Sequence, residues 1–105
     1  MAQFSVHENS NPRTRDDIPF LLDVQSDVLS ILATRMVVPL YRSDAIRSRA
    51  MTRLTPSVRF KNKALVAMVP EMAGIHLRDL GPLAGDLPDV RGEMVQAIDL
   101  LITGF

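Results

Sequence analysis

The alternation of apolar and polar residues in the first part of the chain predicts several short strands. Residues 3–7 (QFSVH) alternate with a period of two, which is typical of a strand with one buried face, and His7 is expected on its polar face. Compact apolar runs at residues 19–24 (PFLLDV) and 35–40 (RMVVPL) predict two further strands. Pro39 has no N–H to donate to a ladder, so this end of the second strand is expected to lie at a sheet edge or bulge.

A β-hairpin is predicted in the middle of the chain. Residues 57–61 (SVRFK) and 64–69 (ALVAMV) have strand-like patterns, and residues 62–63 are a plausible turn between them. Residues 26–34 (SDVLSILAT) fit either one turn of helix or a loop, and residues 43–54 fit a short helix. The pattern alone leaves the conformation of these last two segments open.

Near the C-terminus the apolar period changes from that of a strand to that of a helix. Residues 75–80 (IHLRDL) still alternate and place His76 on an exposed face, and residues 81–88 read as a connection rich in glycine and proline. Beyond them an α-helix is predicted to about Thr103, with Gly104 as its C-terminal stop. The apolar face of this helix, expected in the core or at a dimer face, consists of Val90, Met94, Ala97, Ile98, Leu101, Ile102 and Phe105.

These elements predict a mainly β fold with a C-terminal α-helix: a small antiparallel sheet or barrel with the helix packed on it. The 105 residues fit one domain, residues 1–105, with room for a modest core. No apolar run reaches the roughly 18 residues of a membrane span, and the N-terminus lacks a signal-peptide pattern. A cytoplasmic location is therefore expected.

The composition argues against catalysis. The chain has no cysteine and only two histidines, which excludes a disulfide framework, a thiolate metal site and a multi-histidine centre. Phosphate-binding glycine loops and nucleophile elbows are absent from the sequence. Asp23 and Asp27 could share a proton as a dyad, but a turn carboxylate that accepts backbone N–H groups is the favoured interpretation. We therefore expect no enzyme, no cofactor and no metal.

Charge is unevenly distributed although the formal net charge is zero. Residues 41–63 hold seven basic side chains and a single acidic one, whereas the segments on either side are acidic. Such a block can attract phosphates or an acidic peptide, or it can be a solvated face balanced by acidic neighbours. Few aromatic residues interleave the charges, so direct nucleic-acid binding is the weaker interpretation.

Four stretches taken together resemble the CcdB family, the gyrase-poisoning toxins of plasmid and chromosomal toxin–antitoxin modules. They occur in the family's order across nearly the whole chain. The stretches are Gln3-Phe4-x-Val6, LDVQSDVL at residues 22–29, RMVVPL at residues 35–40 and IDLLITGF at residues 98–105.

The resemblance implies a homodimer with an SH3-like barrel, a small extra sheet and a C-terminal helix. It implies binding to the A subunit of DNA gyrase, which traps gyrase on cleaved DNA without chemistry by the toxin itself. It also implies a cognate antitoxin that neutralises the toxin, with operon repression and operator DNA contact only through that complex. Roles in plasmid maintenance and transcription regulation follow, and no membrane partner is implied.

The family's gyrase-contacting positions fall on two segments of this chain. They are Val28, Leu29, Asp99, Ile102, Thr103, Gly104 and Phe105. Three of them depart from the family pattern: Thr103 replaces a tryptophan, Asp99 an asparagine and Phe105 a final isoleucine. Tryptophan offers a flat face that can anchor an interface, which threonine lacks. The alternative is therefore a non-toxic module that only engages the antitoxin and tunes operon repression.

Overall fold

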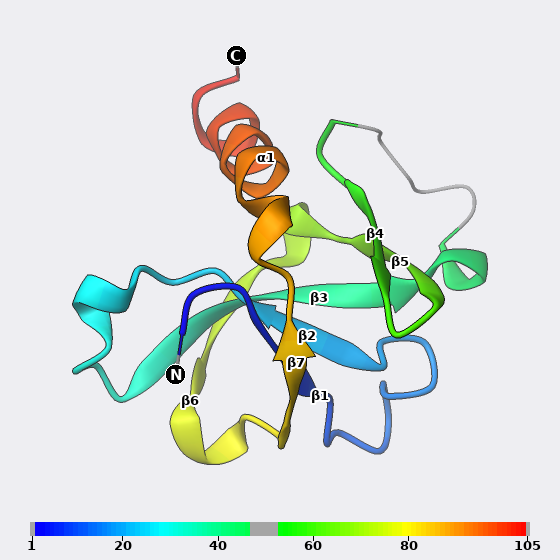
Figure 1. Ribbon diagram of the computed structural model, residues 1–105, viewed down its shortest axis with the longest axis horizontal. Helices are drawn as coiled ribbons and strands as arrows, with labels where there is room; N and C mark the ends of the chain where they lie inside the picture. The colour runs from blue at the N-terminus through cyan, green and yellow to red at the C-terminus, as the bar shows by residue number, and fades with distance from the viewer. Residues whose placement is uncertain (1, 47–52, 105) are drawn as a thin grey trace.

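The computed structural model describes residues 2–46 and 53–104 as a curled antiparallel sheet with one helix (Figure 1). This arrangement confirms the predicted mainly β fold with a C-terminal helix. The elements are β1 (Ser5–Glu8), β2 (Phe20–Asp23), β3 (Thr34–Arg42), β4 (Ser57–Phe60), β5 (Lys63–Ala67), β6 (Ala73–His76), β7 (Leu83–Asp86) and α1 (Arg91–Thr103).

The sheet is built on β3, its longest strand. The strand order is β4-β5-β3-β2-β1-β7, and β6 pairs with the N-terminal half of β3 on the edge where β5 pairs with the C-terminal half. β3 is thus a central strand, so the predicted sheet edge at this end is wrong, but the pairing on one side is interrupted at Pro39 itself. Pro39 falls between the β5 and β6 pairings, where its carbonyl accepts a 3.0 Å hydrogen bond from the Met68 N–H. Its missing N–H faces that gap, so no ladder bond is lost.

The two ends of the strand order approach each other through aromatic packing. Phe60 at the end of β4 meets Phe20 edge to face, with ring centroids 5.0 Å apart. A Cβ atom built on Gly85 in β7 would lie only 2.8 Å from the Phe60 ring, so the ring packs directly on the backbone there. The sheet therefore curls into a half-barrel around a core of buried apolar side chains.

The hairpin is confirmed, with its turn one residue earlier than predicted. Lys61 and Asn62 both have positive φ angles, 50° and 64°, which is the backbone of a type I′ turn. This turn has the twist that suits two antiparallel strands. Lys63 consequently begins β5 and does not belong to the turn.

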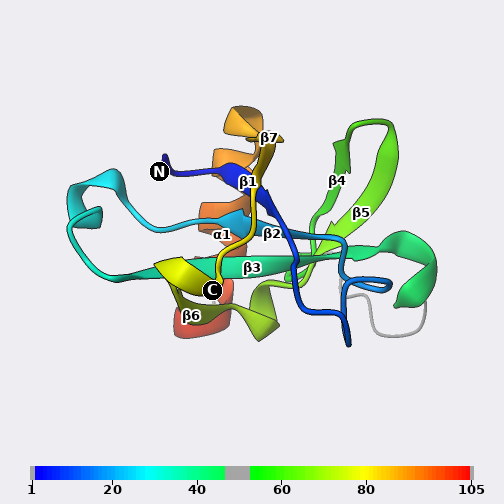
Figure 2. The ribbon, with the colours of Figure 1, turned by 90° about the horizontal axis from the view of Figure 1, so that it is seen from below.

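The helix α1 packs on the core through its N-terminal half only. Met94 and Ala97 are buried against the sheet, and Ile98 is partly buried. The C-terminal end rises above the strands in Figure 1, and Figure 2, seen from below, shows α1 behind β1, β2 and β3. The helix ends at Gly104, which has the left-handed φ of 80° and donates its N–H to the Leu100 carbonyl. Within the described residues, no helix is both long and apolar enough to cross a membrane.

Two strand predictions near residue 80 need correction. The alternation at residues 75–80 predicts a strand, but β6 ends at His76 and a short 3₁₀ turn, η4 (Leu77–Asp79), follows. The glycine-rich and proline-rich connection contains β7, which pairs with β1. Its short run, LAGD, has almost no apolar alternation, because one position is the glycine that admits the Phe60 ring.

Gly81 is a point where two backbones approach closely, and its replacement tests this packing. A Cβ atom at Gly81 would lie 2.1 Å from the carbonyl oxygen of Glu8, so Gly81→Ala forces the connection away from β1. We expect a loss of about 1–3 kcal/mol in the free energy of unfolding, measured by urea denaturation. Gly92→Ala, in the first turn of α1 with no atom within 4 Å, is the matched control and should not destabilise. Equal stability of the two variants would contradict the close approach.

Candidate functional site

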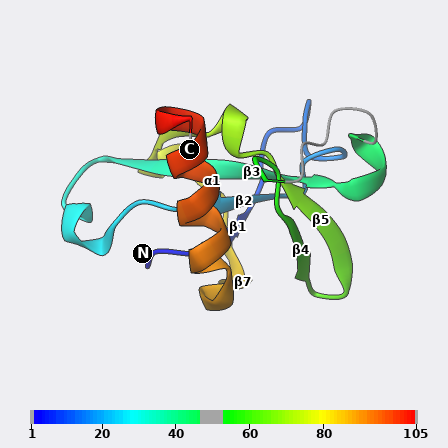
Figure 3. The ribbon, with the colours of Figure 1, turned by 90° about the horizontal axis from the view of Figure 1, so that it is seen from above.

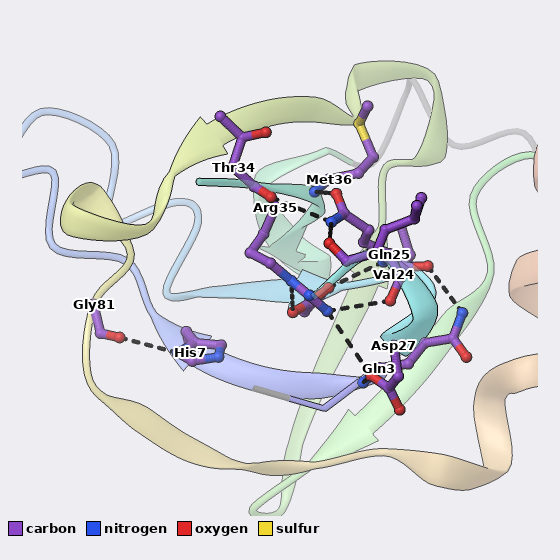
Figure 4. Close-up of polar contacts among 11 residues, drawn as sticks. Gln3, His7, Val24, Gln25, Asp27, Thr34, Arg35, Met36 and Gly81 are labelled. Atoms are coloured by element: carbon purple, nitrogen blue, oxygen red, sulfur yellow. Dashed lines mark hydrogen bonds and ion pairs between the residues drawn. The ribbon is translucent and has the colours of Figure 1, made fainter. Parts of the chain in front are cut away.

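A buried ion pair joins the ends of β2 and β3. The Arg35 Nε atom lies 2.7 Å from Asp23 Oδ2, and the two side chains are 1% and 0% exposed. Asp23 Oδ1 accepts a 3.0 Å hydrogen bond from the Gln25 N–H, and Arg35 Nη2 donates to the Gln25 carbonyl at 3.2 Å. The antiparallel register, with Asp23 opposite Val37, places both side chains on the same face of the sheet. The pair therefore fixes the chain as it leaves β2 (Figure 4).

The structure settles the roles of the two carboxylates considered as a dyad. Asp23 accepts a backbone N–H, as the favoured interpretation predicted, and its charge partner Arg35 was not foreseen. Asp27 accepts a 2.7 Å hydrogen bond from the Gln3 N–H, and its other close contact is Arg35 Nη2 at 4.0 Å. The Arg35 guanidinium thus lies against both carboxylates, which is the arrangement of an ion-pair cluster and not that of two carboxyl groups facing each other.

The loop after β2 carries the first pair of predicted target contacts. Residues 26–34 were expected to form either one turn of helix or a loop. The structure has one short 3₁₀ turn, η1 (Asp27–Leu29), followed by a loop that leads to Thr34 at the start of β3. Val28 is 86% exposed, and Leu29, Ile31 and Leu32 are exposed beside it. Large apolar side chains gathered on one loop without cover from their own chain mark an interaction surface.

The C-terminal end of α1 carries the second group. Asp99, Ile102, Thr103 and Gly104 are all exposed, with Ile102 at 70%. Thr103 Oγ1 donates to the Asp99 carbonyl at 2.6 Å, so its hydroxyl is used within the helix. Phe105, the last predicted contact, lies outside the described residues.

The apolar stripe of this helix is therefore only half buried within one chain. Burial of Leu101 and Ile102 in the core was one expectation, and it is wrong: both are exposed. The reason is length, because α1 extends beyond the strands on which its first turns pack (Figure 1). An interface with another chain, the second expectation for this stripe, is the remaining way to bury these residues.

The structure holds the two predicted contact segments apart. Figures 1 and 3 show η1 and the C-terminal end of α1 as separate projections from the sheet. A surface hollow of about 580 Å³ lies elsewhere, and its lining includes none of the predicted contact residues. The two segments thus present projecting side chains and do not line this hollow.

His7 is buried, which corrects the prediction that it lies on an exposed face. Its side chain is 4% exposed, and Nδ1 lies 3.0 Å from the Gly81 carbonyl oxygen (Figure 4). The alternation was right, but the connection before β7 covers the second face of β1. His76 is exposed, as predicted. Among the described residues, no three acidic or histidine side chains converge in a way that could hold a metal ion.

The basic block is partly occupied by contacts within the chain. Arg42 pairs with Asp17 and Asp44 at 3.5 and 3.8 Å, and both interactions are solvent-exposed. Lys61 and Lys63 place their ammonium groups over the rings of Phe60 and Phe20. Arg47 and Arg49, which also belong to the block, lie outside the described residues.

Breaking the buried ion pair should destabilise the fold strongly. Asp23→Asn leaves the Arg35 charge buried without its counter-ion, and we expect a loss of about 3–5 kcal/mol in the free energy of unfolding. The measurement is the free energy of unfolding by urea denaturation. It is made on the single variants Asp23→Asn and Arg35→Met and on the double variant Asp23→Leu/Arg35→Met. The double variant should recover much of the loss, because neither charge remains. A loss below about 1 kcal/mol in Asp23→Asn would contradict the buried pair.

Sequence comparison places this architecture in a known family. The family model described as CcdB protein matches residues 3–104, nearly the whole chain. The match includes β1, the β2–β3 loop with its ion pair, and α1 as far as Gly104, so it covers both contact segments described above. The half-barrel with one C-terminal helix is consistent with the fold of that family. The chain belongs to the CcdB family.

Proposed function

We propose that this protein is the toxin of a type II toxin–antitoxin module and that it binds and poisons the A subunit of DNA gyrase. Membership of the CcdB family supports a toxin–antitoxin role with gyrase as the target in general. The finer proposal is that a cognate antitoxin neutralises the protein and that the two together repress their operon. The proposed action is binding alone, without catalysis by the toxin.

The observation that carries the proposal is the exposure of apolar side chains at the family's contact positions. Val28 and Leu29 on η1 and Ile102 on α1 are large, apolar and uncovered by their own chain. Exposed apolar area is stabilised when a partner removes it from water, at about 25 cal/mol per Å². These side chains are therefore suited to be anchors of an interface.

Binding by itself is sufficient to poison an enzyme that passes through a cleaved intermediate. A ligand shifts a conformational equilibrium toward the state that it binds more tightly. A toxin that fits the cleaved-DNA conformation of gyrase better than the resealed one prolongs the break. A hundredfold preference corresponds to about 2.7 kcal/mol of differential binding, which one or two buried apolar side chains supply.

The proposed homodimer multiplies this surface. Leu101 and Ile102 are exposed on a helix half that no strand covers, so a second copy of the chain is a suitable partner for the Leu101 side. Two helices that pack near their C-terminal ends would present both tips to one target. The predicted contacts of the tip, Asp99, Thr103 and Gly104, are exposed in the single chain.

The alternative function, an antitoxin-binding module without toxicity, is favoured by one specific feature of the helix tip. Thr103 occupies the position of the family's tryptophan, and its hydroxyl donates to the Asp99 carbonyl. It therefore offers neither a flat ring nor a free O–H donor to a target. Under this alternative the basic hairpin, with Arg59, Lys61 and Lys63, would attract an acidic antitoxin segment.

Single replacements in the two projections test the toxin proposal. We expect the protein to inhibit supercoiling by purified gyrase and to produce protein-linked cleaved DNA. Val28→Ser and Ile102→Ser should each weaken binding to the A subunit by about tenfold or more, since each removes a large apolar side chain. Leu83→Ser, at an exposed apolar position of β7 away from both projections, is the matched control and should bind as the unchanged protein does.

Two outcomes would contradict the proposal. Supercoiling that continues at micromolar protein would favour the antitoxin-only alternative. Normal poisoning by both serine variants would show that gyrase is bound through another surface.

A further inference from the structure

The side chain of Gln25 joins the beginning of the η1 loop to its far end. Its amide Nε2 donates to the Leu29 carbonyl at 3.1 Å and to the Thr34 carbonyl at 3.2 Å. Its Oε1 accepts the Met36 N–H at 3.0 Å. A primary amide has two N–H donors and one carbonyl acceptor, and here all three sites are used across the loop (Figure 4).

The main chain of Gln25 is fixed independently by the buried ion pair. Its N–H donates to Asp23 and its carbonyl accepts from Arg35. Gln25 therefore has a rigid base, and its side chain transmits that rigidity to the loop. Asp23 and Arg35 thus hold the backbone of Gln25, and the side-chain amide of Gln25 in turn holds the carbonyl of Leu29.

The loop has little else to hold its shape. None of the residues of η1 is buried, and its other backbone bonds are short-range ones, from Leu29 to Ser26, from Ser30 to Asp27 and from Leu32 to Leu29. Two further ties come from outside the loop: the Gln3 N–H donates to Asp27, and the Leu77 N–H donates to the Ala33 carbonyl near the start of β3. A loop with exposed backbone bonds and no core contacts opens at low free-energy cost.

We infer that Gln25 is the positioning residue of the target-binding loop: it orders η1 so that Val28 and Leu29 are presented in one conformation, without contacting the target itself. The consequence for binding rests on the proposed function. When only a fraction of molecules has the competent loop, the apparent affinity falls by that fraction. Ordering the loop before binding removes this loss.

Gln25→Glu tests the inference with a side chain of nearly the same shape. A carboxylate would place an acceptor oxygen where an N–H donor now faces the Leu29 and Thr34 carbonyls, so attraction becomes repulsion. Gln25→Met, which keeps the length and removes all polar contacts, is the second variant. Asn62→Asp makes the same amide-to-carboxylate change at the hairpin turn and controls for the added charge.

Two measurements on these variants separate the loop from the target. Hydrogen exchange of the free protein should show the backbone N–H groups of Leu29 and Ser30 exchanging about tenfold faster or more in both Gln25 variants. The Met36 N–H, which Gln25 Oε1 accepts, should exchange faster in Gln25→Met, because glutamate keeps an acceptor oxygen. The N–H groups of β2 and of the rest of β3 should be unchanged. Association with the gyrase A subunit should slow by a similar factor while the dissociation rate stays nearly constant. Val28→Ser, which removes a contact, should raise the dissociation rate and leave exchange unchanged.

Each outcome decides the inference. Faster loop exchange with slower association supports it, whereas unchanged exchange in both Gln25 variants overturns it. Unchanged exchange with faster dissociation overturns it in another way, because Gln25 would then touch the target. If the unchanged protein binds no gyrase, the proposed function fails, and faster loop exchange still shows that Gln25 orders the loop. If Gln25→Glu unfolds, the exchange of Gln25→Met decides.

Discussion

The pairing of Asp23 with Arg35 is the interaction on which the functional half of this molecule depends. Two charges buried at the end of a β-ladder are costly unless each has its counter-ion and hydrogen bonds. Here the partners come from β2 and β3, and their spare atoms bind both backbone groups of Gln25. The pair therefore ties the register of the central strands to the path of the chain that leaves them. A loss of this geometry would therefore affect both the stability of the fold and the position of the loop.

The molecule divides into a closed frame and two projections. The frame is the curled sheet. Its two end strands, β4 and β7, approach each other where the Phe60 ring packs on Gly85. The core beneath α1 uses Met94 and Ala97 from the earlier turns of the helix, and the last turn is exposed. The η1 loop likewise adds nothing to the core. Stability and recognition thus use different residues, which is expected where binding residues lie on segments held by a rigid scaffold.

Most of the fold could be predicted from local patterns, and the failures have a common physical cause. Apolar periodicity identified β2, β3, the hairpin and α1, since each buries a face of its own residues. β7 and the burial of His7 depend on contacts between segments more than 70 residues apart, such as His7 with Gly81, which no local pattern encodes. Motif resemblance placed the contact segments, and the structure shows them exposed. The Asp23–Arg35 pair could be predicted only with the register of β2 and β3 known. The sequence did show one charged residue near the end of each of the two apolar runs.

The exposed η1 loop has a consequence for how such a protein changes over generations. Its outer side chains are exposed, and hydrogen bonds from Asp23, Gln25 and Arg35 at its base support its backbone. Substitutions at the tip should therefore carry little penalty to folding, as surface changes away from packed or paired groups generally do. Under the proposed function, residues 28–32 could follow a changing target while the supporting residues stay fixed. The architecture separates the evolution of specificity from the evolution of stability.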